Sequence, residues 1–271
     1  MNSSPIGIMD SGIGGLGVLN LIKALLPGER LIYVADKAYC PYGSLPVEEI
    51  RHRCILISLF FLSHNCKMIV IACNTATAAA IETLRATFTG IPVVGLEPAV
   101  KPAVLHTHTG IVGVLATPGT FKGRLYNRTL ATFGGQVKVI ERVGEGWVGA
   151  VERGDLDTPA TREMVRKTIQ PMLDEGVDHL VLGCTHYPFL IPVIRSIAGP
   201  GVVIVDPAPA VARRVKNLLT NNGLLSGGVP DGEKDLFYTS SADTSVLPKA
   251  VPYTENLGTM NWRPYTFENM E

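Results

Sequence analysis

The sequence predicts an α/β protein of two pseudo-symmetric, doubly wound lobes, with the active site in the cleft between them. Three observations support this prediction. Short runs rich in Val and Ile alternate with longer amphipathic segments, and this alternation defines the α/β class. Most runs lack strict polar alternation, which is typical of strands buried on both faces of a parallel sheet. The chain also repeats its own motifs at nearly constant spacing.

The expected strands share four or five mostly apolar residues: Ile6–Met9, Leu31–Val34, Met68–Ala72, Val93–Leu96, Ile111–Leu115, Val137–Ile140, His179–Leu182 and Val202–Val205. Between them, Val47–Phe61, Thr75–Phe88 and Pro159–Glu175 have the length and apolar spacing of helices. Asp157 or Thr158 is the expected N-cap of the last of these helices, because a short polar side chain there can accept a free backbone N–H.

Three motifs occur twice in the same order. IGIMDSG (Ile6–Gly12) resembles VGVLATPG (Val112–Gly119), IVIACNT (Ile69–Thr75) resembles LVLGCTH (Leu180–His186), and VVGLEPAV (Val93–Val100) resembles VVIVDPAPAV (Val202–Val211). The matches place Asp10 opposite Thr117, Cys73 opposite Cys184 and Glu97 opposite Asp206, at spacings of 107 to 111 residues. These spacings favour an internal duplication; the alternative is that two unrelated segments converged on the same strand–loop–helix pattern.

A duplicated chain predicts one discontinuous lobe, residues 1–97 plus 207–271, and a second lobe of residues 98–206. In doubly wound sheets, ligands bind beyond the carboxyl ends of the strands. Asp10, Cys73, Thr117 and Cys184 each follow an expected strand directly. We therefore expect the substrate to lie with one cysteine on each side.

Composition excludes several classes of protein. Of the 271 residues, 46% are hydrophobic and 18% charged, which is a globular balance, and the formal net charge is zero. A neutral chain gives no reason to expect nucleic acid or an anionic membrane as a partner. The start MNSSPIGIMDSG lacks the basic and apolar regions of a signal peptide, so we expect a cytoplasmic protein.

The cysteines predict chemistry rather than a disulfide framework. Their number is odd, five, and no C-x-x-C occurs, so reduced thiols are expected. Cys73 and Cys184 each stand between an expected strand and an expected helix. A helix N-terminus favours the thiolate and offers backbone N–H groups to a carboxylate. A lone cysteine there is more often a small buried hydrophobe, but two in equivalent positions favour function.

Two matched thiols suit a reaction that is symmetric in energy. Enantiomers have equal free energy, so an enzyme that interconverts them needs a base on one face of the carbon and an acid on the other. In the reverse direction the two roles exchange. A thiolate and a thiol form such a pair. Cys40, Cys54 and Cys66 receive no such task and are expected to be structural.

At these positions the sequence resembles the glutamate racemases, within the aspartate/glutamate racemase family. The motifs that carry the resemblance are MDSGIGGL (Met9–Leu16), YVAD (Tyr33–Asp36), CPYG (Cys40–Gly43), ACNTA (Ala72–Ala76), VVGLEPA (Val93–Ala99), ATPGT (Ala116–Thr120) and GCTHYP (Gly183–Pro188). They extend from the N-terminus to about residue 214, and the C-terminal tail carries no recognisable motif.

The resemblance implies two facing α/β lobes, L- and D-glutamate as substrates, no cofactor and no metal, a homodimer, and supply of D-glutamate for peptidoglycan. It implies that Cys73 deprotonates D-glutamate and Cys184 deprotonates L-glutamate, with Asp10 beside Cys73 and Glu152 and His186 beside Cys184. The substrate-binding residues that it implies are Asp10, Ser11, Pro41, Tyr42, Gly43, Asn74, Thr75, Thr117, Thr120, Thr185 and His186. Without the resemblance, Glu152 would be interpreted as a solvated charge at a helix end.

Four alternatives remain open at the level of sequence. Gly12–Gly17 spells G-x-G-x-x-G after a strand, and Asp36 follows at the distance of a ribose-binding acid, so an NAD site is the main rival. Asp10 argues against it, because a carboxylate there would repel a pyrophosphate. Zinc on Cys184 and His186 lacks further ligands with suitable spacing. A cysteine hydrolase or a two-lobed binding protein leaves the second thiol unexplained.

Overall fold

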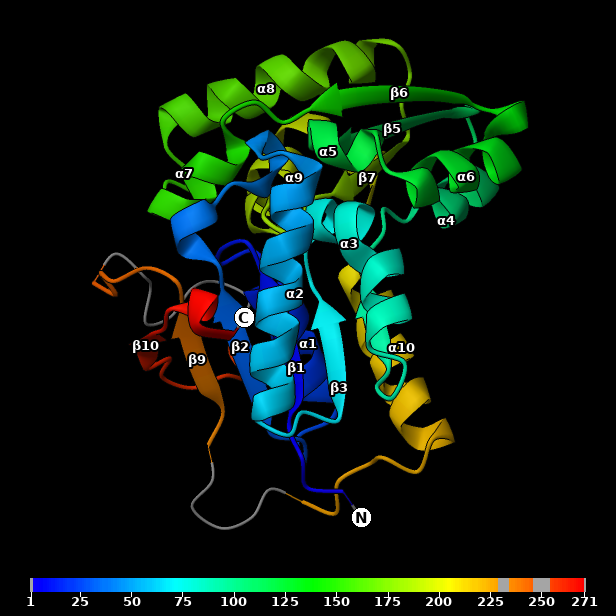
Figure 1. Cartoon of the computed structure of the whole chain (residues 1–271). Coiled ribbons are helices and arrows are strands. Elements are labelled where there is room, and N and C mark those ends of the chain that lie inside the picture. The colour runs from blue at the N-terminus through cyan, green and yellow to red at the C-terminus, as the bar shows by residue number, and fades with distance from the viewer. Residues whose placement is uncertain (1, 229–233, 246–253, 271) are drawn as a thin grey trace. The chain divides into compact units, whose positions relative to one another are not determined.

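The computed structural model describes residues 2–228, 234–245 and 254–270. The chain divides into two compact units: unit 1 comprises residues 1–96 and 208–271, and unit 2 comprises residues 97–207. Each unit contains its own parallel sheet with helices packed against it (Figure 1). The predicted α/β class is therefore confirmed.

The sheet of unit 1 has six strands, all parallel to their neighbours, in the order β10-β9-β2-β1-β3-β4. Its strands are β1 (Ile6–Asp10), β2 (Leu31–Ala35), β3 (Met68–Ile71), β4 (Val93–Gly95), β9 (Leu236–Thr239) and β10 (Trp262–Pro264). The first three are buried along their whole length, as continuous apolar runs in a parallel sheet should be. The four strands expected from the sequence are confirmed, whereas β9 and β10 were not predicted.

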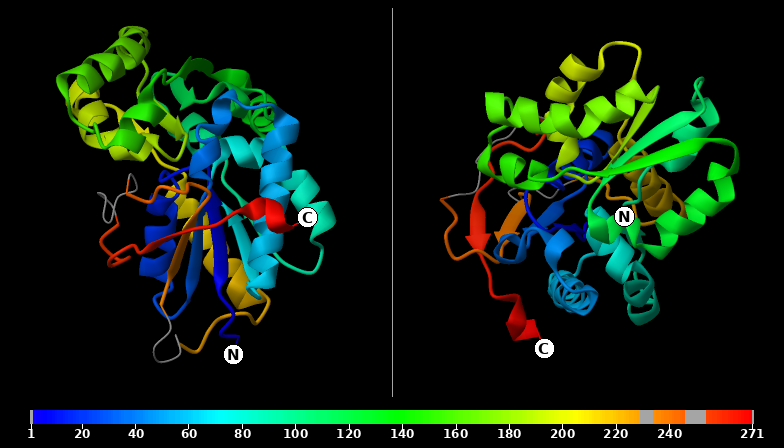
Figure 2. Two further views of the ribbon diagram at one scale, coloured as in Figure 1. Left: turned by 60° about the vertical axis from the view of Figure 1, so that its left-hand side comes forward. Right: turned by 90° about the horizontal axis from the view of Figure 1, so that it is seen from above.

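Helices cover both faces of this sheet. Helix α1 (Leu16–Leu25) packs against α10 (Ala208–Asn221), and α2 (Val47–Ser63) packs against α3 (Asn74–Thr87). Figures 1 and 2 show α1 and α2 on opposite faces of the strands. Figure 2 also shows the C-terminal segment running from β10 to the side of α2, where η5 (Phe267–Met270) packs against that helix.

Unit 2 has a four-stranded parallel sheet in the order β6-β5-β7-β8. Its elements are α4 (Val100–His106), β5 (Ile111–Ala116), α5 (Pro118–Phe121), α6 (Arg124–Phe133), η3 (Gly134–Gln136), β6 (Lys138–Val143), α7 (Trp147–Arg153), α8 (Pro159–Asp174), β7 (His179–Gly183), α9 (Ile191–Ala198) and β8 (Val203–Val205). Helix α8 begins as predicted at Thr158, whose hydroxyl accepts the Thr161 amide at 3.1 Å.

The two units repeat one topology. The order β2-β1-β3-β4 in unit 1 matches β6-β5-β7-β8 in unit 2. In the central pairs, Gly7 lies opposite Ile69 and Gly113 opposite Leu180. A Cβ on either glycine would collide with a helix side chain, that of Phe61 or Met172. The same close helix–strand contact at the same place supports the duplication.

The strand register corrects one predicted equivalence. It pairs Met9 with Ile71 and Ala116 with Gly183, so that Ser11 stands level with Cys73 as Thr117 does with Cys184. Thr117 is therefore the counterpart of Ser11, and the prediction that it matches Asp10 was wrong by one residue. The motif letters were aligned through DSG and TPG, whereas the sheet aligns the strands through their glycines.

No helix among the described residues has the length and apolar character that crossing a lipid bilayer requires.

Candidate active site

The carboxyl edge of the unit 1 sheet brings Asp10, Ser11 and Cys73 together. Strands β1 and β3 are hydrogen-bonded neighbours, and the Ala72 amide continues their ladder by donating to the Met9 carbonyl at 2.8 Å. Asp10 and Ser11 at the end of β1 therefore lie beside the segment that holds Cys73. All three side chains are buried.

Cys73 is the N-cap of α3, as the sequence predicted. Its backbone is extended, and its Sγ accepts the Ala76 amide at 3.4 Å. A sulfur in this place receives a backbone N–H and the positive end of the helix dipole, and both interactions favour the thiolate. Cys73 can therefore act as a base at the edge of the sheet.

The glycine-rich turn after β1 is packed around Asp10. The Gly12 amide donates to Asp10 Oδ1 at 2.8 Å, and the Tyr33 hydroxyl donates to the Gly12 carbonyl at 2.8 Å. A Cβ on Gly15 would lie 2.8 Å from both the Asp10 Cβ and the Tyr33 hydroxyl. Gly15 is thus required by the packing of the turn itself, which explains it without a bound pyrophosphate.

Asp36, the acid that an NAD site would need, is committed elsewhere. It is fully buried, and Arg53 on α2 donates to both of its oxygens, from Nε at 2.9 Å and Nη2 at 2.8 Å. The Tyr42 hydroxyl donates to Asp36 Oδ2 at 2.5 Å. A carboxylate held by three donors is not available to a ribose, so the geometry argues against the dinucleotide alternative.

The same contacts fix the loop that contains Pro41, Tyr42 and Gly43. The loop comprises η1 (Lys37–Tyr39) and η2 (Tyr42–Ser44), joined by a cis peptide before Pro41, and η2 lies against α3. Burial, and after it the Asp36 carboxylate, raise the pKa of Tyr42 well above its usual value. The hydroxyl of Tyr42 therefore stays protonated and serves as a donor that anchors the loop.

Asn74 carries an unsatisfied carboxamide next to Cys73. Its Oδ1 and Nδ2 are both buried and neither has a hydrogen-bond partner. A buried amide without partners is unfavourable by about 1–3 kcal/mol, so such a group indicates that a ligand supplies the missing bonds. Thr75, the next residue, is also buried at the first turn of α3.

In unit 2, Cys184 follows β7 and has a histidine as neighbour. Its Sγ lies 3.8 Å from His186 Nδ1, and His186 Nε2 lies 2.5 Å from Glu152 Oε1. The imidazole is 2% exposed and the Glu152 side chain 7% exposed. Sulfur, imidazole and carboxylate thus form a connected row in which a proton on one ring nitrogen is matched by the group at the other.

The structure overturns one expectation about Cys184. A helix was expected to begin at this residue, but the chain turns through Thr185 and His186 and enters a 3-10 helix, η4 (Tyr187–Leu190), before α9. Pro188 explains the difference, because a proline disfavours the α conformation in the residue before it. Cys184 therefore has an imidazole where Cys73 has a helix N-terminus.

The sequence gave no reason to expect Glu152 near His186, and an aromatic contact explains the meeting. Glu152 lies on α7, which begins at Trp147. The Trp147 ring packs edge-on against Tyr187 with centroids 4.8 Å apart, and the Tyr187 hydroxyl accepts the Gly144 amide at 3.2 Å. Both rings are fully buried. They join α7 to the segment after β7 and so hold the carboxylate against the imidazole.

The other expected residues of unit 2 lie at the same sheet edge. Thr117 follows β5, the neighbour of β7, and its hydroxyl accepts the Thr120 amide at 3.3 Å as N-cap of α5. The two hydroxyls lie 3.0 Å apart. Together with Thr185 they are buried. This edge therefore offers hydroxyl groups on both sides of the strand pair that precedes Cys184.

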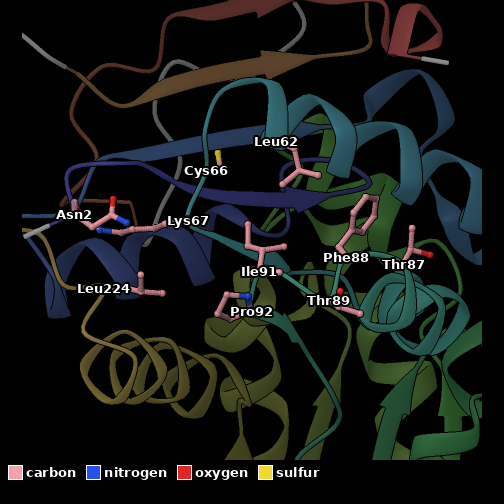
Figure 3. Close-up of a pocket in the computed structure, with 11 residues that line it drawn as sticks. Asn2, Leu62, Cys66, Lys67, Thr87, Phe88, Thr89, Ile91, Pro92 and Leu224 are labelled. Atoms are coloured by element: carbon pink, nitrogen blue, oxygen red, sulfur yellow. Dashed lines mark hydrogen bonds between the residues drawn. The ribbon is translucent and has the colours of Figure 1, made fainter.

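A separate pocket lies at the opposite edge of the unit 1 sheet (Figure 3). Its volume is about 470 Å³, and Lys67 and Pro92, which line it, directly precede β3 and β4. Lys67 is already paired with Glu29 at 2.6 Å. The pocket is thus at the amino ends of the strands, away from Cys73, and contains none of the expected site residues.

Comparison with known proteins agrees with this site. Residues 6–215 match the family model described as Asp/Glu/Hydantoin racemase. A protein of Methylococcus capsulatus named glutamate racemase is 49% identical over 239 residues, which cover 88% of each chain.

Solved structures extend the similarity to the fold. A glutamate racemase from Francisella tularensis, in complex with D-glutamate, matches with a TM-score of 0.84 and 26% identity over 99% of this chain and 100% of the other. The Escherichia coli glutamate racemase, in complex with L-glutamate and the activator UDP-MurNAc-ala, matches with a TM-score of 0.77 and 30% identity over 93% and 92%. The chain therefore belongs to the Asp/Glu/hydantoin racemase family, and within it to the group of the glutamate racemases.

Proposed function

We propose that the enzyme interconverts L- and D-glutamate by moving the Cα proton between two cysteines, with no metal and no cofactor. The high similarity to proteins named glutamate racemase supports the substrate, as do the glutamate complexes of two structural relatives. The two thiols at equivalent strand ends of a repeated unit are the observation that carries the mechanism.

The proposed step is balanced in protons and charge. Starting from D-glutamate, the Cys73 thiolate takes the Cα proton and becomes a thiol, and the electron pair of the C–H bond passes to the substrate carbon. The Cys184 thiol then donates its proton to the opposite face of that carbon and becomes a thiolate. The reverse reaction starts from this second state, so each half of the cycle restores the other.

The groups around each thiol receive matching roles in the proposal. Asp10 and Ser11 bind the substrate amino group beside Cys73, and His186 with Glu152 assists proton transfer at Cys184. Backbone and side-chain donors that hold the carboxylates come from Pro41, Tyr42, Gly43, Asn74, Thr75, Thr117, Thr120 and Thr185. The unpartnered carboxamide of Asn74 supports this assignment most directly, because a carboxylate can accept from its Nδ2.

The proposed product is D-glutamate for peptidoglycan, and through it for cell-wall biogenesis and cell shape. We further propose that the enzyme acts in the cytoplasm as a homodimer, with glutamate as its partner and neither nucleic acid nor a membrane.

Heavy water provides the test of the reaction. Incubation with either enantiomer, with no added cofactor, should yield the opposite enantiomer labelled with deuterium at Cα. Addition of EDTA should leave the rate unchanged. A reaction that depends on added nicotinamide, or product without the label, would refute the proposal.

Cysteine variants test the mechanism. Cys73→Ala and Cys184→Ala should each abolish racemisation while glutamate still binds in calorimetry. Cys66→Ala is the matched control, because burial raises the pKa of Cys66 to about 12 and places it at the other edge of the sheet. Near-native turnover in either of the first two variants contradicts the two-thiol scheme.

A further inference from the structure

The C-terminal tail reaches the loop that contains Tyr42. The segment after β10 places Phe267 in the interior, with its ring centroid 5.2 Å from that of Phe60 on α2. The Tyr265 amide donates to the Thr239 carbonyl at 2.8 Å, so the segment also continues from the sheet. These contacts fix the position of Glu268, the next residue.

Glu268 binds two members of the loop's anchoring cluster. Its Oε1 forms an ion pair with Arg53 Nη1 and accepts the Tyr39 hydroxyl at 3.1 Å. The Arg53 guanidinium lies under the Tyr39 ring, with Cζ 4.0 Å from the centroid. Hydrogen bonding to Glu268 raises the pKa of Tyr39, as expected for a hydroxyl that donates to a carboxylate.

Arg53 connects both ends of the loop to one guanidinium. Through Asp36 it anchors Tyr42, and through its face and Glu268 it anchors Tyr39. Its side chain is 2% exposed, so its orientation is set by these partners rather than by solvent. A rigid fork with several donors suits this task, because one side chain can hold several groups in fixed relative positions.

We propose that Arg53 and Glu268 are positioning residues for the glutamate-binding loop, and that the C-terminal tail thereby contributes to substrate affinity. Neither side chain is assigned a contact with substrate. They act through Tyr39 and Tyr42, which flank the backbone of Pro41 and precede that of Gly43. The proposal rests on the proposed function, in which this loop holds a substrate carboxylate.

Glu268 is the residue to change, because removal of Arg53 would leave the buried Asp36 unpaired and threaten folding. Glu268→Ala removes both contacts, whereas Glu268→Gln keeps an acceptor and loses the charge. The Glu268 side chain is 46% exposed, so solvent screens part of the interaction. We expect Glu268→Ala to raise KM about three- to tenfold for both enantiomers, with kcat changed less than about twofold, and Glu268→Gln to have a smaller effect.

Hydrogen exchange supplies a measurement that does not depend on turnover. The peptide spanning residues 37–45 should exchange faster in Glu268→Ala, while peptides from β1 and β3 should not change. Glu175→Gln serves as control, since it breaks an exposed ion pair with Lys138 in unit 2. An unchanged KM or an unchanged exchange rate of that peptide overturns the proposal. Failure of the proposed function would instead show as no glutamate turnover in the unaltered chain, and the exchange experiment would still test the anchor.

Discussion

Asp178 anchors the turn that leads into β5, and its replacement should destabilise unit 2. Its carboxylate accepts the Thr107 hydroxyl at 2.7 Å, the amides of His108 and Thr109 at 2.6 and 3.1 Å, and lies 2.9 Å from His179 Nδ1. Burial alone raises the pKa of this carboxyl, but the hydrogen bonds outweigh burial and hold the pKa well below its usual range.

The size of the effect follows from the bonds that asparagine cannot keep. In Asp178→Asn one oxygen becomes an NH2 group whose hydrogens face other donors, and the negative charge is lost. Hydrogen bonds to a charged group are each worth about 1.5–3 kcal/mol, and the side chain is only 13% exposed. We expect the free energy of unfolding at pH 7 to fall by about 3 kcal/mol, and Tm to fall by roughly 6–12 °C.

The pH dependence of this loss has a defined sign. A carboxyl whose folded-state pKa lies below the unfolded value of about 3.9 stabilises the fold fully above that value, and the stabilisation is lost as the pH falls through the folded-state pKa. The difference between the parent protein and Asp178→Asn should therefore be constant from pH 5 to 7. It should be smaller by about 1 kcal/mol at pH 3.

Urea unfolding followed by circular dichroism at pH 3, 5 and 7 measures this difference. Other carboxyl groups titrate in both proteins and cancel in the comparison. A loss below about 0.5 kcal/mol at pH 7, the range of ordinary surface substitutions, would refute the argument. So would a difference that does not shrink at pH 3.

Three further substitutions test the site and its scaffold. Gly15→Ala should lower both Tm and kcat/KM, because the added methyl meets atoms at 2.8 Å, whereas Gly17→Ala, with nothing within 4 Å, should preserve kcat/KM. His186→Asn should reduce kcat/KM about 10²- to 10⁴-fold and Glu152→Gln less, since the histidine adjoins the sulfur and the glutamate acts through it; steady-state assays in both directions check this order. Thr158→Ala should cost about 1 kcal/mol in urea unfolding through loss of the α8 N-cap; no measurable change would contradict it.

Local sequence patterns predicted the repeated scaffold and missed its additions. The eight central strands were found because buried runs of Val and Ile mark them, and their ends shift by at most a few residues. Strands β9 and β10 are short segments, LFYT and WRP, outside the alternation of strand and helix. Only their pairing with β2 and with each other makes them strands, and pairing is not visible in a local pattern.

Site residues divide in the same way. Cys73 and Asp10 were predicted because each ends or follows a buried strand, which is local information. Glu152 would have been assigned to solvent from sequence alone, since its partner His186 is 34 residues away. The contact of Arg53 with Glu268 spans 215 residues and leaves no periodic trace. Such pairs form only when tertiary packing brings the elements together.

The unequal surroundings of the two thiols are compatible with an energetically symmetric reaction. Cys73 has a helix N-terminus and the Ala76 amide, whereas Cys184 has the imidazole of His186. Because enantiomers have equal free energies, the ratio of kcat/KM in the two directions must equal one for the parent protein and for every active variant. Substitution of His186 must therefore lower kcat/KM equally for L- and D-glutamate, even though it adjoins only one thiol. A difference between the two directions beyond experimental error would mean that the assay measures something other than a racemisation, whatever the surroundings of the two sulfurs.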